Sequence, residues 1–153
     1  MNNSKTHVVL VTGASDGLGK GLAIALAKTG ATVLVHGRDP ARIEDTIAAL
    51  QRAAPSAVVR GYRADFGSLA EVRALAADVI ANERQLDVLV NNAGIGTNVP
   101  GGPSRQESSD RHELRFAVNY LAPYLLSELL LPKLRENRPA RIVNVSSLGQ
   151  QAI

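Results

Sequence analysis

The stretch VTGASDGLG, Val11–Gly19, places three glycines between an apolar run and a helix-like segment. The apolar run, residues 7–12, is continuous and rich in β-branched side chains, which is typical of a strand covered on both faces. After the turn, residues 18–30 carry leucine and alanine at helical spacing and end on a glycine. A strand, a glycine turn and a helix in this order predict the first unit of an alternating α/β fold.

The same alternation continues to the end of the chain. Strands are expected over residues 31–37, 57–64, 86–94 and 141–145, and helices over residues 40–53, 68–83 and 110–136. Asp39 and Pro40 suit the start of the first of these helices, and Ser68 with Glu71 forms a capping-box pattern at the second. Right-handed crossovers between parallel strands give a doubly wound α/β sheet, here in a single domain of residues 1–153. Ligands of such sheets bind outside the carboxyl ends of the strands.

Composition argues against several classes of function. The chain has 153 residues, is 45% hydrophobic and 20% charged, and its 17 basic and 14 acidic residues give a net charge of +3. The basic residues are scattered, which argues against nucleic-acid binding. The absence of cysteine removes disulfides and thiolate metal sites, and no metal site is predicted. No signal peptide begins the chain, and its longest apolar segment contains Ser127 and Glu128, so we expect a cytoplasmic protein without a membrane span.

The three glycines of the turn suit a phosphate-binding site. Gly13 would permit unusual backbone angles, Gly17 would let a phosphate approach the main chain, and Gly19 would allow close packing of helix and strand. Free N–H groups at the start of the helix carry partial positive charge, which suits a diphosphate. The alternative is a tight turn that needs glycine for its geometry alone.

Four motifs, in this order, resemble those of the short-chain dehydrogenase/reductase family. They are T-G-x-x-x-G-x-G at Thr12–Gly19, N-N-A-G at Asn91–Gly94, the helical Asn119 and the serine Ser147 in IVNVSS. The resemblance covers essentially the whole chain, and residues 113–151 are similar to the retinol-dehydrogenase-like branch. It implies a Rossmann fold with three α/β/α layers. It also implies hydride transfer between a nicotinamide and an alcohol or carbonyl substrate, with a hydrophobic compound favoured.

The resemblance also implies a set of cofactor-binding residues at the ends of the strands. They are Gly13, Ser15, Asp16, Gly17, Leu18, Gly19, Arg38, Asp65, Phe66, Asn92, Ala93 and Gly94. Gly37 stands where NAD enzymes usually carry an acid, and Arg38 follows it, which favours NADP with NAD as the alternative. His36 and Arg42 would add positive potential. The structural alternatives are a solvated Arg38 and an Asp65 that only forms a turn.

Ser147 and Asn119 match the catalytic positions of the family. Ser147 would polarise the substrate oxygen, and Ser146 would cap or pack. The backbone of Asn119 would hold a water, helped by Pro123, which has no N–H to offer the carbonyl four residues before it. The bland alternatives are strand-end capping for the two serines, and an exposed or internally satisfied amide for Asn119.

The family's Y-x-x-x-K pair is absent from the sequence. None of the three tyrosines has a lysine four residues later, and Tyr120 and Tyr124 are expected to be packing residues of the long helix. We therefore expect the chain to be the amino-terminal part of a dehydrogenase, truncated before that pair and inactive alone. Its last strand would form an apolar, unpaired edge of the sheet.

Two other classes of function compete with the oxidoreductase. A non-catalytic dinucleotide-binding module, acting as a sensor or partner-binding protein, would use the same turn. An S-adenosylmethionine-dependent methyltransferase shares the sheet but explains neither N-N-A-G nor Ser147. The long helix, residues 110–136, could pair with a copy of itself in a homo-oligomer or only line the core.

Overall fold

The computed structural model describes residues 6–96, 104–136 and 139–146. Five parallel strands form one sheet in the order β3-β2-β1-β4-β5. The strands are β1 (Val8–Val11), β2 (Thr32–Gly37), β3 (Val59–Arg63), β4 (Val88–Asn91) and β5 (Arg141–Asn144). The helices are α1 (Gly17–Lys28), α2 (Pro40–Ala53), α3 (Leu69–Asn82), α4 (Leu114–Phe116), the π-helix η1 (Ala117–Leu121) and α5 (Ala122–Glu136). The predicted doubly wound parallel sheet is confirmed.

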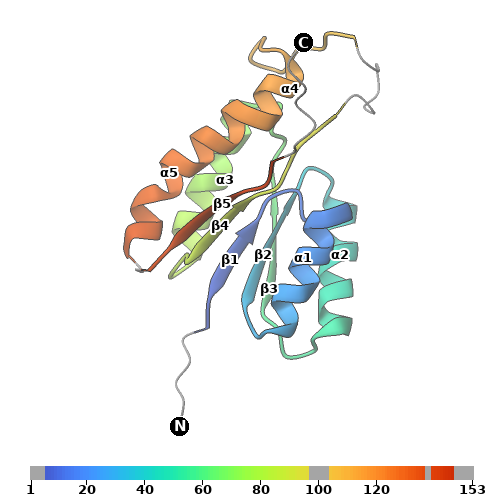
Figure 1. Cartoon of the computed structure of the whole chain (residues 1–153), viewed down its shortest axis with the longest axis vertical. Helices are drawn as coiled ribbons and strands as arrows, with labels where there is room; N and C mark the ends of the chain where they lie inside the picture. Colours follow the sequence, from blue (N-terminus) through green and yellow to red (C-terminus); the bar gives the residue numbers. More distant parts are fainter. Residues whose placement is uncertain (1–5, 97–103, 137–138, 147–153) are drawn as a thin grey trace.

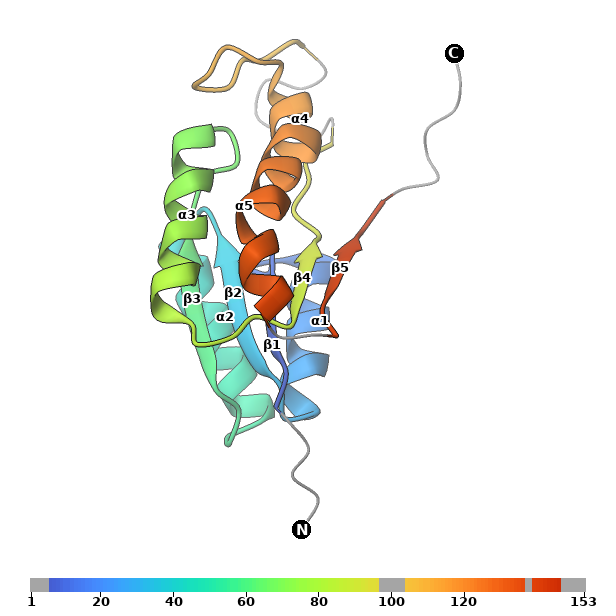
Figure 2. The same ribbon diagram turned by 90° about the vertical axis from the view of Figure 1, so that its left-hand side faces the viewer.

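Helices cover both faces of the sheet, which gives the predicted three layers. Figure 1 shows α1 and α2 on one side and α3 and α5 on the other, and Figure 2 shows α3 and α5 lying across the front of the strands. β1 contributes side chains to the cores on both faces of the sheet. Val8 and Leu10 belong to the core under α3 and α5, whereas Val9 and Val11 belong to the core under α1 and α2. Alternation along a strand covered on both faces explains why this segment is apolar throughout.

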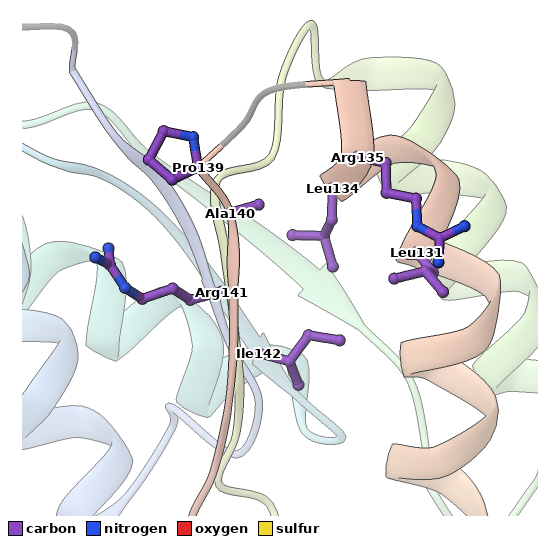
Figure 3. Close-up of a pocket in the computed structure, with 7 residues that line it drawn as sticks. All are labelled: Leu131, Leu134, Arg135, Pro139, Ala140, Arg141 and Ile142. Atoms are coloured by element: carbon purple, nitrogen blue, oxygen red, sulfur yellow. The ribbon is translucent and has the colours of Figure 1, made fainter.

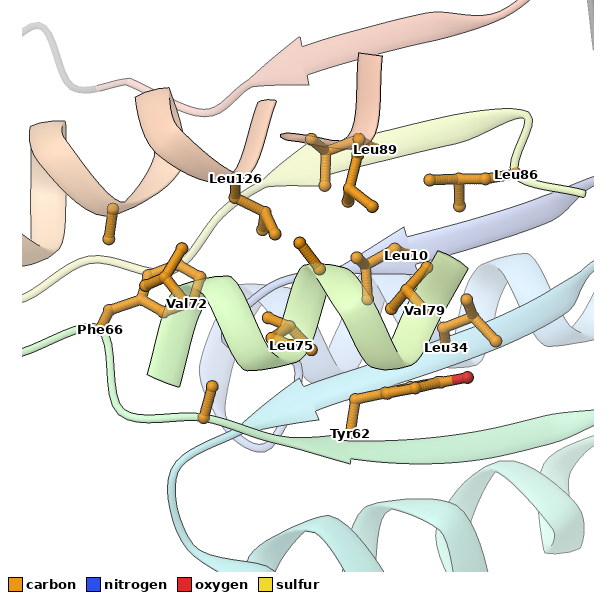
Figure 4. Close-up of a cluster of buried hydrophobic side chains, with 14 of the residues drawn as sticks. Leu10, Leu34, Tyr62, Phe66, Val72, Leu75, Val79, Leu86, Leu89 and Leu126 are labelled. Atoms are coloured by element: carbon orange, nitrogen blue, oxygen red, sulfur yellow. The ribbon is translucent and has the colours of Figure 1, made fainter. Parts of the chain in front are cut away.

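The larger core lies between the sheet and helices α3 and α5. Leu10 and Leu89 of the sheet meet Leu75 of α3 and Leu126 of α5 there, and each is at most 1% exposed (Figure 4). Burial of such side chains contributes roughly 1.5–3 kcal/mol each to folding. This packing fixes the carboxyl ends of the central strands relative to one another.

The order of the strands reverses beside β1. The chain runs outward from β1 to β2 and β3, then crosses back to pair β4 and β5 on the other side. Val11, the last residue of β1, is in register with Val35 of β2 and Val90 of β4. The connections that follow β1 and β4 therefore separate above neighbouring strands, which opens a crevice at this edge.

Helix starts follow the sequence in two places. Asp39 is the N-cap of α2 and accepts from the Ala41 N–H at 2.9 Å, with Pro40 at the first position, as predicted. Ser68 is the N-cap of α3, also as predicted. The Glu71 carboxylate departs from the capping box, since it accepts from the Asp65 N–H at 2.8 Å. Glu71 therefore fixes the segment that follows β3.

The long helix begins later than expected. Helix geometry starts at Leu114 rather than at Asp110. The Asp110 carboxylate accepts from the Leu69 N–H at 2.8 Å, and Arg111 has a left-handed φ of 62°. Asp110 therefore satisfies an open donor at the start of α3, and the left-handed residue after it interrupts any helix begun there.

The first part of this helix is widened. In η1, the Ala122 N–H donates to the Ala117 carbonyl, one residue further back than in an α-helix. Pro123 supplies no N–H, so the Asn119 carbonyl lacks its α-helical donor. π-helical turns of this kind are frequent at functional sites. The water that we expect on this carbonyl stays a prediction.

Two tyrosines of this helix are not packing residues, contrary to expectation. Tyr120 and Tyr124 are 58% and 59% exposed, and they stack in series with the exposed Phe116 at centroid distances of 5.2 and 6.4 Å. Their spacing of four residues places the three rings along one solvent-facing stripe.

Of the helices that the structure describes, none is long and apolar enough to cross a membrane.

Candidate functional site

A crevice of about 710 Å³ lies at the carboxyl ends of the central strands. Its walls include all twelve residues predicted to bind a cofactor. The other lining residues are His36, Gly37, Ala64, Ile95, Gln106, Leu114 and Val118. A hollow of this size at a topological switch point is suited to a small-molecule ligand.

Two glycines of the turn are required by close packing and one by its backbone conformation. Gly13 has a φ of +62°, and a Cβ built on it would lie 2.8 Å from the Ala93 Cα. A Cβ on Gly19 would overlap the Gly13 carbonyl and the Asn92 amide. Gly17, with a φ of +50° and open space around it, needs glycine for its backbone conformation. The turn after β1 and the loop after β4 therefore touch through their main chains.

Thr12 and Asn92 hold these two segments together. The buried Thr12 hydroxyl donates to the Val90 carbonyl at 3.1 Å and accepts from the N–H groups of Asn92 and Ala93 at 2.9 and 3.0 Å. The Asn92 amide donates to the Thr12 carbonyl at 2.8 Å and to the Gly13 carbonyl at 3.2 Å. Thr12, the first residue of one sequence motif, and Asn92, the second residue of the other, thus form one hydrogen-bonded junction.

Asp16 begins helix α1. Its carboxylate accepts from the Gly17 N–H at 2.7 Å and lies 3.1 Å from the Arg42 guanidinium, with both side chains exposed. The positive potential expected from Arg42 is therefore offset by this carboxylate. Arg38 also lines the crevice, and it makes no ion pair with any residue that the structure describes.

His36 does not supply the positive charge expected of it. The ring is buried, its Nδ1 lies 3.2 Å from the Gly13 N–H, and its Nε2 lies 3.1 Å from the Ala64 carbonyl. Burial lowers the pKa of His36 from 6.5 to about 4, against the smaller opposite effects of the Ala64 hydrogen bond and of the Asp65 charge. His36 is therefore neutral at pH 7.

The ends of β2 and β3 form the wall beyond the turn. A Cβ on Gly37 would lie 2.9 Å from the Ser15 hydroxyl, so Ser15 occupies the space that a side chain would take. Asp65 accepts from the Gly67 N–H at 2.8 Å, which engages one carboxylate oxygen in a turn. Phe66 is buried and stacks on His36 with ring centroids 4.5 Å apart.

Asn119 does not line the crevice, but its side chain holds Ile95, which does. The amide oxygen accepts from the Ile95 N–H at 2.8 Å, and the amide nitrogen donates to the Ile95 carbonyl at 2.9 Å. This pair of bonds fixes the loop that follows β4. The Asn119 side chain is therefore both exposed and satisfied by backbone, and the catalytic role of the residue stays a prediction. Ser147 lies outside the described residues.

Gln106 is a crevice residue that sequence reasoning missed. Its side-chain nitrogen is buried and has no hydrogen-bond partner among the described residues, while its backbone carbonyl accepts from the Leu114 N–H at 2.8 Å. The residue lies in a long loop without periodicity, so no local pattern marks it. An amide nitrogen left unpaired in this position is available to an acceptor on a ligand.

A second hollow, of about 680 Å³, lies at the opposite end of the sheet. It is formed by the end of α5 and the start of β5, where Leu131, Leu134 and Ile142 point toward one another while Arg141 points away (Figure 3). It lies at the amino end of β5, away from the switch point.

Among the described residues, no group of three or more His, Asp or Glu could hold a metal ion.

The chain belongs to the short-chain dehydrogenase family. Residues 7–152 match the sequence profile that describes this family, which confirms the resemblance seen in the four motifs. Among its curated relatives, retinol dehydrogenase 13 of Mus musculus is 40% identical over 144 residues, covering 94% of this chain and 42% of the relative. Retinol dehydrogenase 11 of Homo sapiens is 40% identical over 142 residues, covering 93% and 43%. The chain thus spans less than half the length of these relatives.

Solved structures agree with this assignment. A metagenomic short-chain oxidoreductase in complex with NADP superposes with a TM-score of 0.80 at 32% identity, covering 95% of this chain and 64% of that one. A short-chain dehydrogenase from Sphingobium yanoikuyae in complex with NADPH gives a TM-score of 0.78 at 26% identity, covering 93% and 54%. The two retinol dehydrogenases confirm the similarity to the retinol-dehydrogenase-like branch that residues 113–151 predict.

Proposed function

We propose that the protein is an NADP-dependent oxidoreductase that moves a hydride between the nicotinamide and an alcohol or carbonyl compound. The observation that carries the proposal is the crevice, whose lining includes the glycine turn, Arg38 and Gln106. Within the described part of the chain, Arg38 has no ion pair and the Gln106 amide nitrogen has no hydrogen-bond partner. Relatives named retinol dehydrogenases support a hydrophobic alcohol as the substrate class. The nicotinamide supplies the hydride chemistry when bound, and the chain supplies binding and orientation.

The glycine turn would hold the diphosphate. Residues 17–19 begin helix α1, whose first N–H groups have no partner further back in the helix, and Gly17 leaves open space beside its Cα. Asp16 already takes the Gly17 N–H, so the N–H groups that follow in the first turn are the ones open to an anion. The contacts of Gly13 and Gly19 keep the turn flat against the loop after β4.

Selectivity for NADP would come from the end of β2. Ser15 crowds Gly37, so an acidic side chain that could bind the ribose hydroxyls has no room there. Arg38 follows directly, lines the same crevice and forms no ion pair with a residue that the structure describes. A guanidinium in this position suits the paired hydrogen bonds of a 2′-phosphate.

The adenine would lie between the ends of β3 and the loop that contains Gln106. Asp65 retains one carboxylate oxygen beyond its turn bond, and the unpaired Gln106 amide nitrogen would find an acceptor on the base. Leu114 and Val118 add apolar surface to the same wall. Ser147 would polarise the substrate oxygen at the other end of the cofactor.

Titration with NADPH and NADH, followed by nicotinamide fluorescence, tests the proposal. NADPH should bind more tightly than NADH, and Arg38→Ala should weaken NADPH by about 10- to 100-fold, the range of a charge-assisted hydrogen bond. NADH binding should change by less than about threefold. Arg52→Ala, which removes an equal charge at the far end of α2, is the matched control and should leave both affinities unchanged.

A different result would reject the proposal. Equal affinity for the two dinucleotides in the unchanged protein would remove the NADP preference. A loss of NADPH affinity in Arg52→Ala as large as in Arg38→Ala would attribute the effect to net charge. No binding of either dinucleotide by the folded protein would remove the cofactor function itself.

A further inference from the structure

His36 joins the glycine turn to the wall formed by the end of β3. Two consecutive N–H groups of the turn donate to this one residue: Gly13 to the ring Nδ1 at 3.2 Å, and Ala14 to the backbone carbonyl at 2.8 Å. On its other side, the ring Nε2 lies 3.1 Å from the Ala64 carbonyl and the ring stacks on Phe66. The ring is therefore a bridge between two walls of the crevice.

The partners of the ring fix its protonation. The Gly13 N–H can only donate, so Nδ1 must accept and carry no proton. The Ala64 carbonyl can only accept, so Nε2 must carry the proton. A second proton on Nδ1 would place two donors against each other inside a buried site. Only the neutral Nε2–H form satisfies both bonds.

We propose that neutral His36 is a positioning residue that holds the glycine turn in the shape required by a dinucleotide diphosphate, and that its protonation in acid releases the turn and weakens dinucleotide binding. This inference rests on the proposed function, which does not assign any role to His36. It adds a determinant of affinity that acts through the main chain of the turn, because the Gly13 and Ala14 N–H groups both donate to His36.

The charges around the ring set where acid would act. The negative charge of Asp65, which follows β3, favours the protonated ring. Arg38 carries a positive charge two residues after His36. The Asp16–Arg42 ion pair is exposed. Burial outweighs the favourable Asp65 charge, so the pKa of His36 falls to about 4. The bridge should therefore be intact at pH 6 and lost as the pH falls through about 4.

Two substitutions separate the two ring bonds. In His36→Asn, the amide oxygen lies near the position of Nδ1 and can still accept from the Gly13 N–H, whereas His36→Leu removes both bonds. By calorimetry at pH 7, NADP⁺ should bind about 10-fold more weakly to the leucine variant and within about threefold to the asparagine variant. His112→Asn, at an exposed histidine, is the control and should bind as the unchanged protein does.

The pH profile gives a readout that a merely structural role would not move. Between pH 6 and pH 4, the NADP⁺ affinity of the unchanged protein should fall by more than that of His36→Asn, because only the former has a ring to protonate. The phosphates of NADP⁺ titrate equally in both, so the difference isolates the residue. Parallel profiles for the two proteins would overturn the proposal, as would full NADP⁺ affinity in His36→Leu.

Nitrogen-15 spectra of the ring in the protein without ligand complete the test. They should show the Nε2–H tautomer, neutral at pH 6. The Nδ1–H tautomer or a charged ring at that pH would overturn the bridge even if NADP⁺ binds normally. The expected tautomer with no NADP⁺ binding would instead reject the proposed function and the positioning role that depends on it. Should His36→Leu fail to fold, His36→Gln, which keeps only the donor toward Ala64, replaces it.

Discussion

Strands β4 and β5 are neighbours with the same length and direction but opposite surroundings. Each has four residues, they pair in parallel, and Leu89 of β4 is in register with Ile142 of β5. Leu89 is fully buried, whereas Ile142 is 38% exposed and every residue of β5 is exposed. β5 lies at the edge of the sheet (Figure 2), as predicted. An apolar sequence specifies a strand, but the elements packed around the strand decide how much it contributes to stability.

The two ends of the sheet also differ in how closely their segments are joined. Where β1 and β4 end, the junction of Thr12 and Asn92 binds two loops into one wall of the crevice. Where β5 begins, Leu131, Leu134 and Ile142 line a hollow that no described residue fills. The functional residues proposed above thus lie beside two loops that are hydrogen-bonded to each other.

Truncating the paired residues Leu89 and Ile142 should give the largest difference. Leu89→Ala leaves a cavity in a fully enclosed core and should lower the free energy of unfolding by about 3 kcal/mol. Ile142→Ala should cost less than about 1 kcal/mol, because its side chain already meets solvent. Urea denaturation of the two variants measures both values.

Equal losses in the two variants would contradict the contrast between the strands. They would mean that β5 is covered in solution, so that its exposed surface is buried against another part of the protein or another copy. A comparison of the denaturant slopes m of the two variants would check that the extent of unfolding is unchanged.

A substitution at the junction should have the next largest effect. Thr12→Val keeps the shape of the side chain but leaves the Asn92 and Ala93 N–H groups without their acceptor, and should cost about 2 kcal/mol of unfolding free energy. Thr29→Val is the matched control, since its exposed hydroxyl donates only to the Leu26 carbonyl. It should cost about 0.5 kcal/mol. A loss in Thr12→Val no larger than in the control would show that the junction is not what holds the loops.

The elements of this fold could be predicted because their signals are local. The Asp39–Pro40 start of α2 and the glycine turn before α1 are each specified within a few neighbouring residues, and both were correct. The parallel, doubly wound sheet followed from the alternation together with the handedness of crossovers. Such caps and turns can be predicted without knowing which distant residues pack against them.

The errors concern partners that are distant in sequence. Asp110 leaves the expected helix because it caps α3, 41 residues away, and His36 loses its charge because burial beside Gly13 and Ala64 disfavours it. The prediction that Tyr120 and Tyr124 are packing residues of the long helix is wrong, because their face of the helix meets solvent. Cofactor choice and the roles of the crevice residues stay predictions, because they depend on a ligand.

The smallest expected effect concerns the hydrogen bond between the side chains of Asn91 in β4 and Asn144 in β5. The side-chain amide of Asn91 donates to the Asn144 side-chain oxygen at 2.8 Å. The backbone carbonyl of Asn91 accepts from the Val145 N–H at 2.9 Å. Asn144→Ala should cost at most about 1 kcal/mol, since Asn91 still donates to the Ser127 hydroxyl at 3.0 Å. Hydrogen exchange of the Val145 amide should then accelerate by up to about fivefold.

The Thr12 amide provides the internal reference for that measurement. It donates to the Val90 carbonyl at 3.0 Å within the buried junction, on the other side of β4, and its exchange should not change in Asn144→Ala. Faster exchange at Val145 alone would mean that the edge strand opens independently of the crevice. Equal acceleration at both amides would mean that β4 and β5 open as one unit, in which case the contrast in burial between the two strands is not a contrast in local stability.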